Sequence, residues 1–281
     1  MTAEVPAKAV PGTRGPTAPI GEGERRRDGA RSTLVWDVLQ EVVAARAARA
    51  GRAHLDIVDV GGGTGGFAVP FAALGHRVTV VDPSPDALAA AQRRAAEMRV
   101  TLTAVQGDAG ELARLVGDGA ADLVICHSVL EYVDSPAAAM AAIARVLRPG
   151  ATVSVLAANT VAAVLHRALA GRYAEARHLL ATEGLAAEGA AEPEGAAEPE
   201  GAADGVPRRF TLAGLTALIE GAGLRAGDAH GIRVFAGLLP SGAGAAADPA
   251  AAGELRALEE AAAVYPALRD IAARLHVLGH R

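Results

Sequence analysis

Residues 58–66 read Val-Asp-Val-Gly-Gly-Gly-Thr-Gly-Gly, the end of an apolar strand followed by a loop with five glycines. Glycine lets such a loop turn sharply and brings its backbone within contact distance of a ligand, because no Cβ intervenes. We expect a helix to follow the loop, and the first N–H groups of a helix favour a polar or anionic group. The stretch therefore predicts a strand–loop–helix unit that binds a nucleotide-like cofactor.

Asp82 ends a second apolar strand, predicted over residues 77–81. The glycine loop also satisfies the G-x-G-x-x-G spacing of dinucleotide sites, but such a match is weak in a chain with 33 glycines. An acidic side chain at this strand end can accept hydrogen bonds from two ribose hydroxyls. The alternative is that Asp82 only caps the helix that begins near Asp86. We expect Asp82 to accept hydrogen bonds from the ribose hydroxyls of the cofactor.

Two further turns carry polar residues. A strand at residues 101–105 is followed by Gln106-Gly107-Asp108, which can bracket an adenine ring. The next strand, residues 122–126, leads into His127, at the carboxyl edge where ligands collect in open α/β sheets. A helix then ends in Leu-Arg-Pro-Gly at residues 147–150, before a strand at 152–157.

In these motifs the chain resembles the class I S-adenosylmethionine-dependent methyltransferases. The matching positions, in order, are Asp59 with Gly61, Gly63 and Gly65, then Asp82, Asp108 and residues 147–150. The resemblance implies an α/β, Rossmann-like fold: a seven-stranded, mostly parallel sheet with helices on both faces. Its last strand, residues 273–279, would be antiparallel. It implies S-adenosylmethionine as the cofactor and disfavours a dehydrogenase.

The substrate side is similar to the tRNA 5-carboxymethoxyuridine methyltransferases of that family. The similar segments are Arg31–Trp36, His127–Val133, residues 158–173, Gly231–Phe235 and residues 273–281. This resemblance implies O-methylation of the carboxylate of a modified tRNA wobble uridine. Two alternatives stay open: a small-molecule O- or N-methyltransferase of secondary metabolism, and a non-catalytic sensor that binds S-adenosylmethionine.

Arg233 and His127 are the candidate catalytic residues. Arg233 belongs to a predicted alternating strand, residues 232–235, and could pair bidentately with an anionic acceptor, or be a surface arginine. His127 would form the pocket wall without transferring a proton, since a carboxylate acceptor is already ionised at neutral pH. The resemblance implies that Arg31 closes over the cofactor carboxylate. The candidate cofactor-binding residues are Arg31, Asp59, Gly61, Gly63, Gly65, Asp82, Gln106, Asp108 and His127.

The remaining sequence predicts one domain, residues 29–281, with a disordered tail at 1–28. An acidic low-complexity insertion is predicted at 183–207 and a flexible loop at 240–253, since Pro and Gly recur there with little to bury. A single cysteine, Cys126, excludes an internal disulfide and a multi-cysteine metal site, so no metal is expected.

We expect a cytoplasmic protein, because the sequence has neither a secretory core nor an apolar run of membrane-spanning length. Its partner would be a methyl acceptor, either tRNA or a small molecule. Only eight residues are aromatic, few for an RNA-stacking surface. The oligomeric state stays open.

Overall fold

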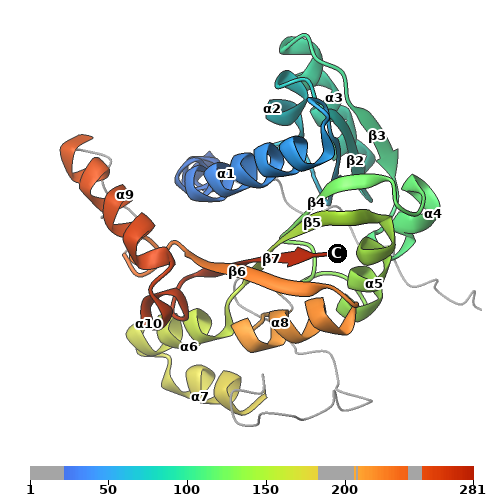
Figure 1. The fold of residues 1–281 in the computed structure, drawn as a ribbon. Helices are drawn as coiled ribbons and strands as arrows, with labels where there is room; N and C mark the ends of the chain where they lie inside the picture. The colour runs from blue at the N-terminus through green and yellow to red at the C-terminus, as the bar shows by residue number, and fades with distance from the viewer. Residues whose placement is uncertain (1–21, 183–205, 207, 240–248) are drawn as a thin grey trace, which may run out of the picture.

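The computed structural model describes residues 22–182, 206, 208–239 and 249–281, and gives only the backbone for residues 22–33, 182 and 249. Within these residues seven strands form one sheet in the order β3-β2-β1-β4-β5-β7-β6 (Figure 1). Only β7 is antiparallel to its neighbours, so the predicted topology is confirmed. The strands are β1 (Asp56–Val60), β2 (Arg77–Asp82), β3 (Thr103–Gln106), β4 (Ala121–His127), β5 (Leu147–Ala158), β6 (Arg225–Ile232) and β7 (Arg274–His280).

Helices cover both faces of this sheet (Figure 1). One core cluster lies between the strands and α1, α2 and α3, and contains Leu39, Phe71 and Leu88. The other lies against α4, α5 and α8, and contains Met140, Ile143, and Leu215. The helices are α1 (Glu22–Ala50), α2 (Ala68–Ala73), α3 (Pro85–Glu97), the 3₁₀ helix η1 (Ala109–Glu111), α4 (Leu112–Val116), α5 (Pro136–Val146), α6 (Thr160–Leu169), α7 (Tyr173–Thr182), α8 (Leu212–Gly221), α9 (Pro249–Ala263) and α10 (Pro266–Arg269).

Helices α3 and α5 begin with the same local chemistry. Ser84 precedes α3 and accepts a hydrogen bond from the backbone N–H of Ala87, and Ser135 accepts one from Ala138 before α5. A proline follows each serine at the first helical position, where its missing N–H costs nothing. The short side chains thus fix where both helices start, at the carboxyl edge of the sheet.

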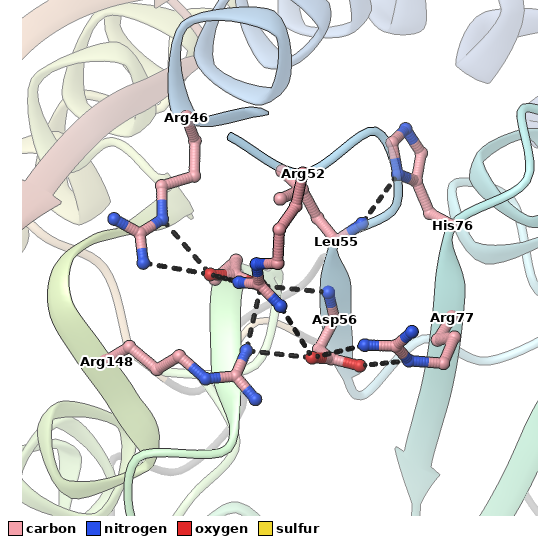
Figure 2. A network of polar contacts seen from close by, with 8 residues as sticks. Arg46, Arg52, Leu55, Asp56, His76, Arg77 and Arg148 are labelled. Carbon is pink, nitrogen blue, oxygen red and sulfur yellow. Dashed lines mark hydrogen bonds and ion pairs between the residues drawn. The ribbon is translucent and has the colours of Figure 1, made fainter. Parts of the chain in front are cut away.

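A network of side-chain ion pairs lies at the opposite, amino edge of the sheet (Figure 2). Asp122, at the start of β4, is fully buried and accepts hydrogen bonds from Arg46, Arg52 and Arg148 and from the backbone N–H of Asp56. These residues come from α1 and its following turn, from β5 and from β1. One carboxylate therefore joins the leading helix to three central strands.

Two helices begin inside segments that the sequence predicted to be irregular. Helix α1 begins at Glu22, inside the predicted tail 1–28, because Glu and Arg in this stretch are good helix formers. Helix α9 begins at Pro249, inside the predicted loop 240–253, with proline at a start position and alanines after it. The tail before residue 22, the insertion apart from residue 206, and the loop before residue 249 lie outside the described residues.

Cys126 is buried in the sheet, as expected of a packing residue. Across the part of the chain that the structure describes, no helix combines the length and the apolar character needed to cross a membrane.

Candidate functional site

The glycine loop between β1 and α2 turns through backbone conformations that only glycine adopts readily. Gly61, Gly63 and Gly65 have φ angles of +63°, +53° and +78°. A Cβ at Gly61 would overlap with the side chain of Val129, which follows β4. The N–H of Gly61 donates to the carbonyl of Val81 at 2.7 Å, which ties the loop to the end of β2. The sequence therefore forces the backbone close to the carboxyl edge of the sheet.

Asp82, the last residue of β2, also holds the glycine loop in place by a hydrogen bond. One carboxylate oxygen accepts a hydrogen bond from Gly63 N–H at 2.9 Å, and the other accepts one from Ser84 N–H at 2.9 Å. The residue is only 7% exposed. A carboxylate oxygen has two lone pairs, so each can still accept from a ligand hydroxyl.

A pocket of about 500 Å³ lies over the carboxyl ends of β1, β2 and β4. Its lining includes Gly61, Asp82, Asp108, Ser128 and Tyr132. The structure therefore brings together three residues that the sequence predicted to bind the cofactor: one loop glycine and two acids. This edge, at a change in strand order, is where open α/β sheets bind ligands.

Other predicted cofactor residues shape the loop without lining this pocket. Asp59 is buried, and a Cβ at Gly62 would lie 2.7 Å from its carboxylate, so Asp59 packs under the loop. Burial raises the pKa of Asp59 to about 7, and the negative charge of the nearby Asp82 acts in the same direction. A backbone hydrogen bond from Ala68 lowers the pKa and offsets part of this rise. Gln106 donates from its side-chain amide to the carbonyl of Pro83 at 3.2 Å.

A second polar group adjoins the pocket beyond β4. Ser128 has a φ of +58°, and its hydroxyl accepts a hydrogen bond from Arg274 at 2.5 Å. Glu131 is buried, accepts from Ala158 N–H at 2.9 Å, and lies 3.6 Å from the same arginine. Burial raises the pKa of Glu131, although Arg274 and the backbone hydrogen bonds act in the opposite direction. This group joins β4, β5 and β7 beside the pocket.

His127, the last residue of β4, lies between the glycine loop and β7. Its ring meets Phe67 edge to face at a centroid distance of 5.0 Å, and its Nε2 lies 2.7 Å from the hydroxyl of Ser154. Burial and the nearby Arg274 lower the pKa of His127 to about 3. The imidazole is therefore neutral at physiological pH. His127 is not among the residues that line the pocket, so its predicted place in the pocket wall stays a prediction.

The alternating strand predicted at residues 232–235 is wrong, because β6 ends at Ile232. Arg233 has a φ of +62°, and the N–H groups of the next three residues all donate to Glu259 of α9, at 2.7, 2.9 and 2.6 Å. Three such charge-assisted bonds turn the chain out of the sheet. The carbonyl of Arg233 accepts from Ala273 N–H, so Arg233 lies next to the start of β7.

The side chain of Arg31 lies outside the described residues, so its predicted closure over the cofactor stays a prediction. Sequence reasoning gave no role to Arg274, Ser154, His276 or Glu259. One signal was available: Arg274 and His276 are two residues apart in a predicted strand and therefore share a face. The others depend on contacts between distant parts of the chain.

A family model described as a methyltransferase domain matches residues 58–155. The tRNA 5-carboxymethoxyuridine methyltransferase of Escherichia coli K12 is 30% identical over 149 residues, which are 51% of this chain and 54% of that protein. A ubiquinone biosynthesis O-methyltransferase of Xanthomonas campestris pv. campestris is 32% identical over 131 residues, 47% of this chain and 53% of that protein. The chain thus spans about half the length of these curated relatives.

Among solved structures, an S-adenosylmethionine-dependent methyltransferase from Mesorhizobium loti is similar over 81% of this chain and 91% of its own length. The TM-score is 0.51 and the sequence identity is 20%. At this identity the likeness concerns the fold alone, which extends beyond the segment matched by the family model.

Proposed function

Because the chain contains a class I S-adenosylmethionine-dependent methyltransferase domain, we propose that it methylates an oxygen acceptor, the carboxylate of a modified tRNA wobble uridine. The observation that carries the methyl-transfer part is the pocket at the carboxyl edge, where the glycine loop and the Asp82 carboxylate meet. The acceptor rests on the similarity to the Escherichia coli tRNA enzyme.

The residues of the pocket fit S-adenosylmethionine. Asp82 keeps a lone pair on each oxygen beyond its two backbone hydrogen bonds, as two ribose hydroxyls require. Asp108 lies in the same lining and would face the adenine side. The volume of about 500 Å³ suits a ligand of nucleoside size.

For this reaction the main task of the protein is to align the acceptor oxygen with the methyl group of the cofactor. Bound S-adenosylmethionine supplies a methyl group activated on a sulfonium, and the acceptor oxygen forms its C–O bond as the C–S bond breaks and the electron pair passes to sulfur. A carboxylate is ionised at neutral pH and needs no general base. Alignment of the two groups can contribute up to about 7–11 kcal/mol. Arg233, beside β7, would hold the acceptor carboxylate by charge-assisted hydrogen bonds.

Tyr132 supports a nucleic-acid acceptor. It lines the pocket and is 59% exposed, so a base bound at the rim could contact this aromatic side chain. The similarity to a ubiquinone biosynthesis O-methyltransferase supports the second candidate, O-methylation of a small molecule, with the same cofactor site.

The test is methyl transfer from radiolabelled S-adenosylmethionine into two pools: tRNA lacking the esterified wobble base, and a small-molecule cell extract. We expect label in tRNA that mild alkali releases, as an ester requires. Label only in small molecules would exclude the tRNA acceptor and support the second candidate. An absence of label in both, with the cofactor bound, would favour the sensor. At limiting S-adenosylmethionine the Asp82→Ala variant should incorporate less label than the wild-type protein.

A further inference from the structure

Ser128, the residue directly after β4, is a serine of the pocket lining with a left-handed backbone. It is half-buried and belongs to the lining, so a ligand in the pocket can reach it. Its φ of +58° is uncommon for a residue with a side chain. Its N–H donates to the carbonyl of Leu156 at 2.7 Å, which holds the turn in place. Such conformations persist where surrounding contacts fix them, and they are frequent at ligand sites.

The contact between Ser128 and Arg274 decides where the proton of the serine hydroxyl can go. A guanidinium carries donors and no acceptor, so the hydroxyl accepts its hydrogen bond from Nη1 of Arg274. The hydroxyl has one proton of its own, and among the described residues this proton has no acceptor. Ser128 therefore offers a ligand in the pocket one hydrogen-bond donor.

Arg274, at the start of β7, is itself held in position. The buried Glu131 carboxylate lies 3.6 Å from Nη1 of the arginine, and it accepts a hydrogen bond from the N–H of Ala158 at the end of β5. The arginine side chain is only 18% exposed, so solvent screens its charge little. A hydrogen bond from a cation polarises the hydroxyl of Ser128, which makes its proton a stronger donor.

The charges around the pocket favour an anionic group of the ligand at Ser128. Among the described residues of the lining, the charged ones are all acids: Asp82, Asp108 and Asp134. These acids repel a ligand carboxylate, whereas the guanidinium of Arg274 attracts it. Arg208 also reaches the lining, but it donates to the carbonyl of Val133, and a carbonyl offers a ligand no donor. Ser128 thus combines a free donor with a neighbouring positive charge.

We propose that the hydroxyl of Ser128 donates a hydrogen bond to a carboxylate oxygen of the ligand bound in the pocket, and that Arg274 is the positioning residue that directs its proton. The inference deepens the proposed function and rests on it for the identity of the ligand. Two carboxylates have the required chemistry: that of the methyl acceptor and that of the amino-acid part of S-adenosylmethionine.

Two substitutions of Ser128 separate the hydroxyl from the backbone. Ser128→Gly and Ser128→Ala both remove the donor, but only glycine adopts the left-handed conformation readily. We therefore expect a higher Tm for the glycine variant than for the alanine variant. We expect both variants to lose carboxylate binding to the same extent, roughly tenfold to a hundredfold. Binding that is lost in the alanine variant and kept in the glycine variant would show a backbone role and overturn the proposal.

Calorimetry and kinetics identify the carboxylate. Each variant is titrated with S-adenosylmethionine and with the analogue that lacks the carboxylate, and its KM is measured for the acceptor that takes label in the transfer assay. A loss for S-adenosylmethionine that the analogue does not show identifies the carboxylate of the cofactor. A loss confined to KM identifies that of the acceptor. Equal losses for S-adenosylmethionine and its analogue would place the hydroxyl at another part of the cofactor and overturn the proposal.

Arg274→Met tests the positioning role. If Arg274 acts through Ser128, the double variant Ser128→Gly/Arg274→Met should lose no more affinity than Ser128→Gly alone. Arg274→Lys, which keeps a cationic donor, should recover part of what Arg274→Met loses. Additive losses in the double variant would show that Arg274 acts independently of the serine and would overturn its positioning role.

Thr152→Val is the matched control. It removes a hydroxyl of β5 that contacts Nδ1 of His280 at 3.2 Å, outside the pocket lining, and it should leave all of these constants unchanged. Normal binding and turnover in both variants of Ser128 would overturn this inference alone. Wild-type protein that neither binds S-adenosylmethionine nor transfers its methyl group would instead contradict the proposed function, and this inference with it.

Discussion

At the scale of single residues, Asp82 has a structural role and, on the proposed function, a binding role as well. Its oxygens fix Gly63 and Ser84 by backbone hydrogen bonds and retain lone pairs for a ribose. We expect Asp82→Ala to weaken S-adenosylmethionine binding by about 1–3 kcal/mol, as loss of charged hydrogen bonds does. Calorimetry measures this. Asp86→Ala, an exposed carboxylate in the first turn of α3, is the control and should bind normally.

Asp59 makes the stability of the protein depend on pH in an unusual direction. Its pKa is about 7 in the folded protein and 3.8 in the absence of the fold. Between these values the folded state binds one proton more than the unfolded chain, so stability falls as pH rises, by up to about 1.4 kcal/mol per unit. Above the folded pKa the loss is complete.

Asp59→Asn removes this titration. We therefore expect the Tm difference between variant and wild type to shift in favour of the variant from pH 5 to pH 8. Scanning calorimetry at several pH values tests this, with the exposed Asp118→Asn as the control. A difference that stays constant with pH would show that Asp59 is ionised in the folded protein.

Arg233 adopts a left-handed backbone beside β7, which is unusual for a side chain of this size. If it holds the acceptor, Arg233→Ala should leave S-adenosylmethionine affinity intact and lower turnover roughly tenfold to a hundredfold. Arg233→Lys should recover part of the turnover. Loss of cofactor affinity and turnover in equal measure would show that the arginine supports the fold instead.

At the scale of elements, the parallel half of the sheet could be predicted from the sequence because each strand is a short apolar run that ends in a polar turn. Asp82 and Asp108 were predicted for the same reason, since the ends of parallel strands meet at one edge. The turn at Arg233 could not be predicted, because its shape depends on Glu259, 23 to 25 residues away from the groups it binds. The contact of Ser154 with His276 spans 122 residues and leaves no local signal.

Asp122 stabilises the packing of α1 against the sheet through its ion pairs with Arg46, Arg52 and Arg148. Asp122→Ala would remove the carboxylate that Arg46, Arg52 and Arg148 share. Breaking a buried pair in this way typically costs about 3–5 kcal/mol, although the partial exposure of the arginines reduces this value. Urea unfolding of the variant measures the loss. The matched control is Asp118→Ala, whose exposed pair with Arg145 should contribute about 0–1 kcal/mol.

At the scale of the whole molecule, the site divides along the sheet. The parallel strands β1, β2, β3 and β4 end around the pocket and supply the glycine loop, Asp82 and Asp108. The antiparallel side carries Arg274 on β7, which contacts Ser128 of the pocket lining, and Arg233 directly after β6. On the proposed function, the cofactor would bind to the parallel half and the acceptor beside the antiparallel side, and methyl transfer would take place where β4 and β5 meet.

This division means that cofactor binding should stabilise the fold as a whole, because the pocket exists only when β1, β2 and β4 are paired. A ligand at 100 times its Kd that binds only the folded state adds about 2.7 kcal/mol, which corresponds to roughly 5–10 °C in Tm for a domain of this size. We expect S-adenosylmethionine to produce this shift in a thermal unfolding assay. NAD at the same concentration should produce none, because the motifs after the glycine loop disfavour a dinucleotide. A shift with NAD alone would contradict the cofactor assignment, and a shift with S-adenosylmethionine that is undiminished in Asp82→Ala would place binding away from this pocket.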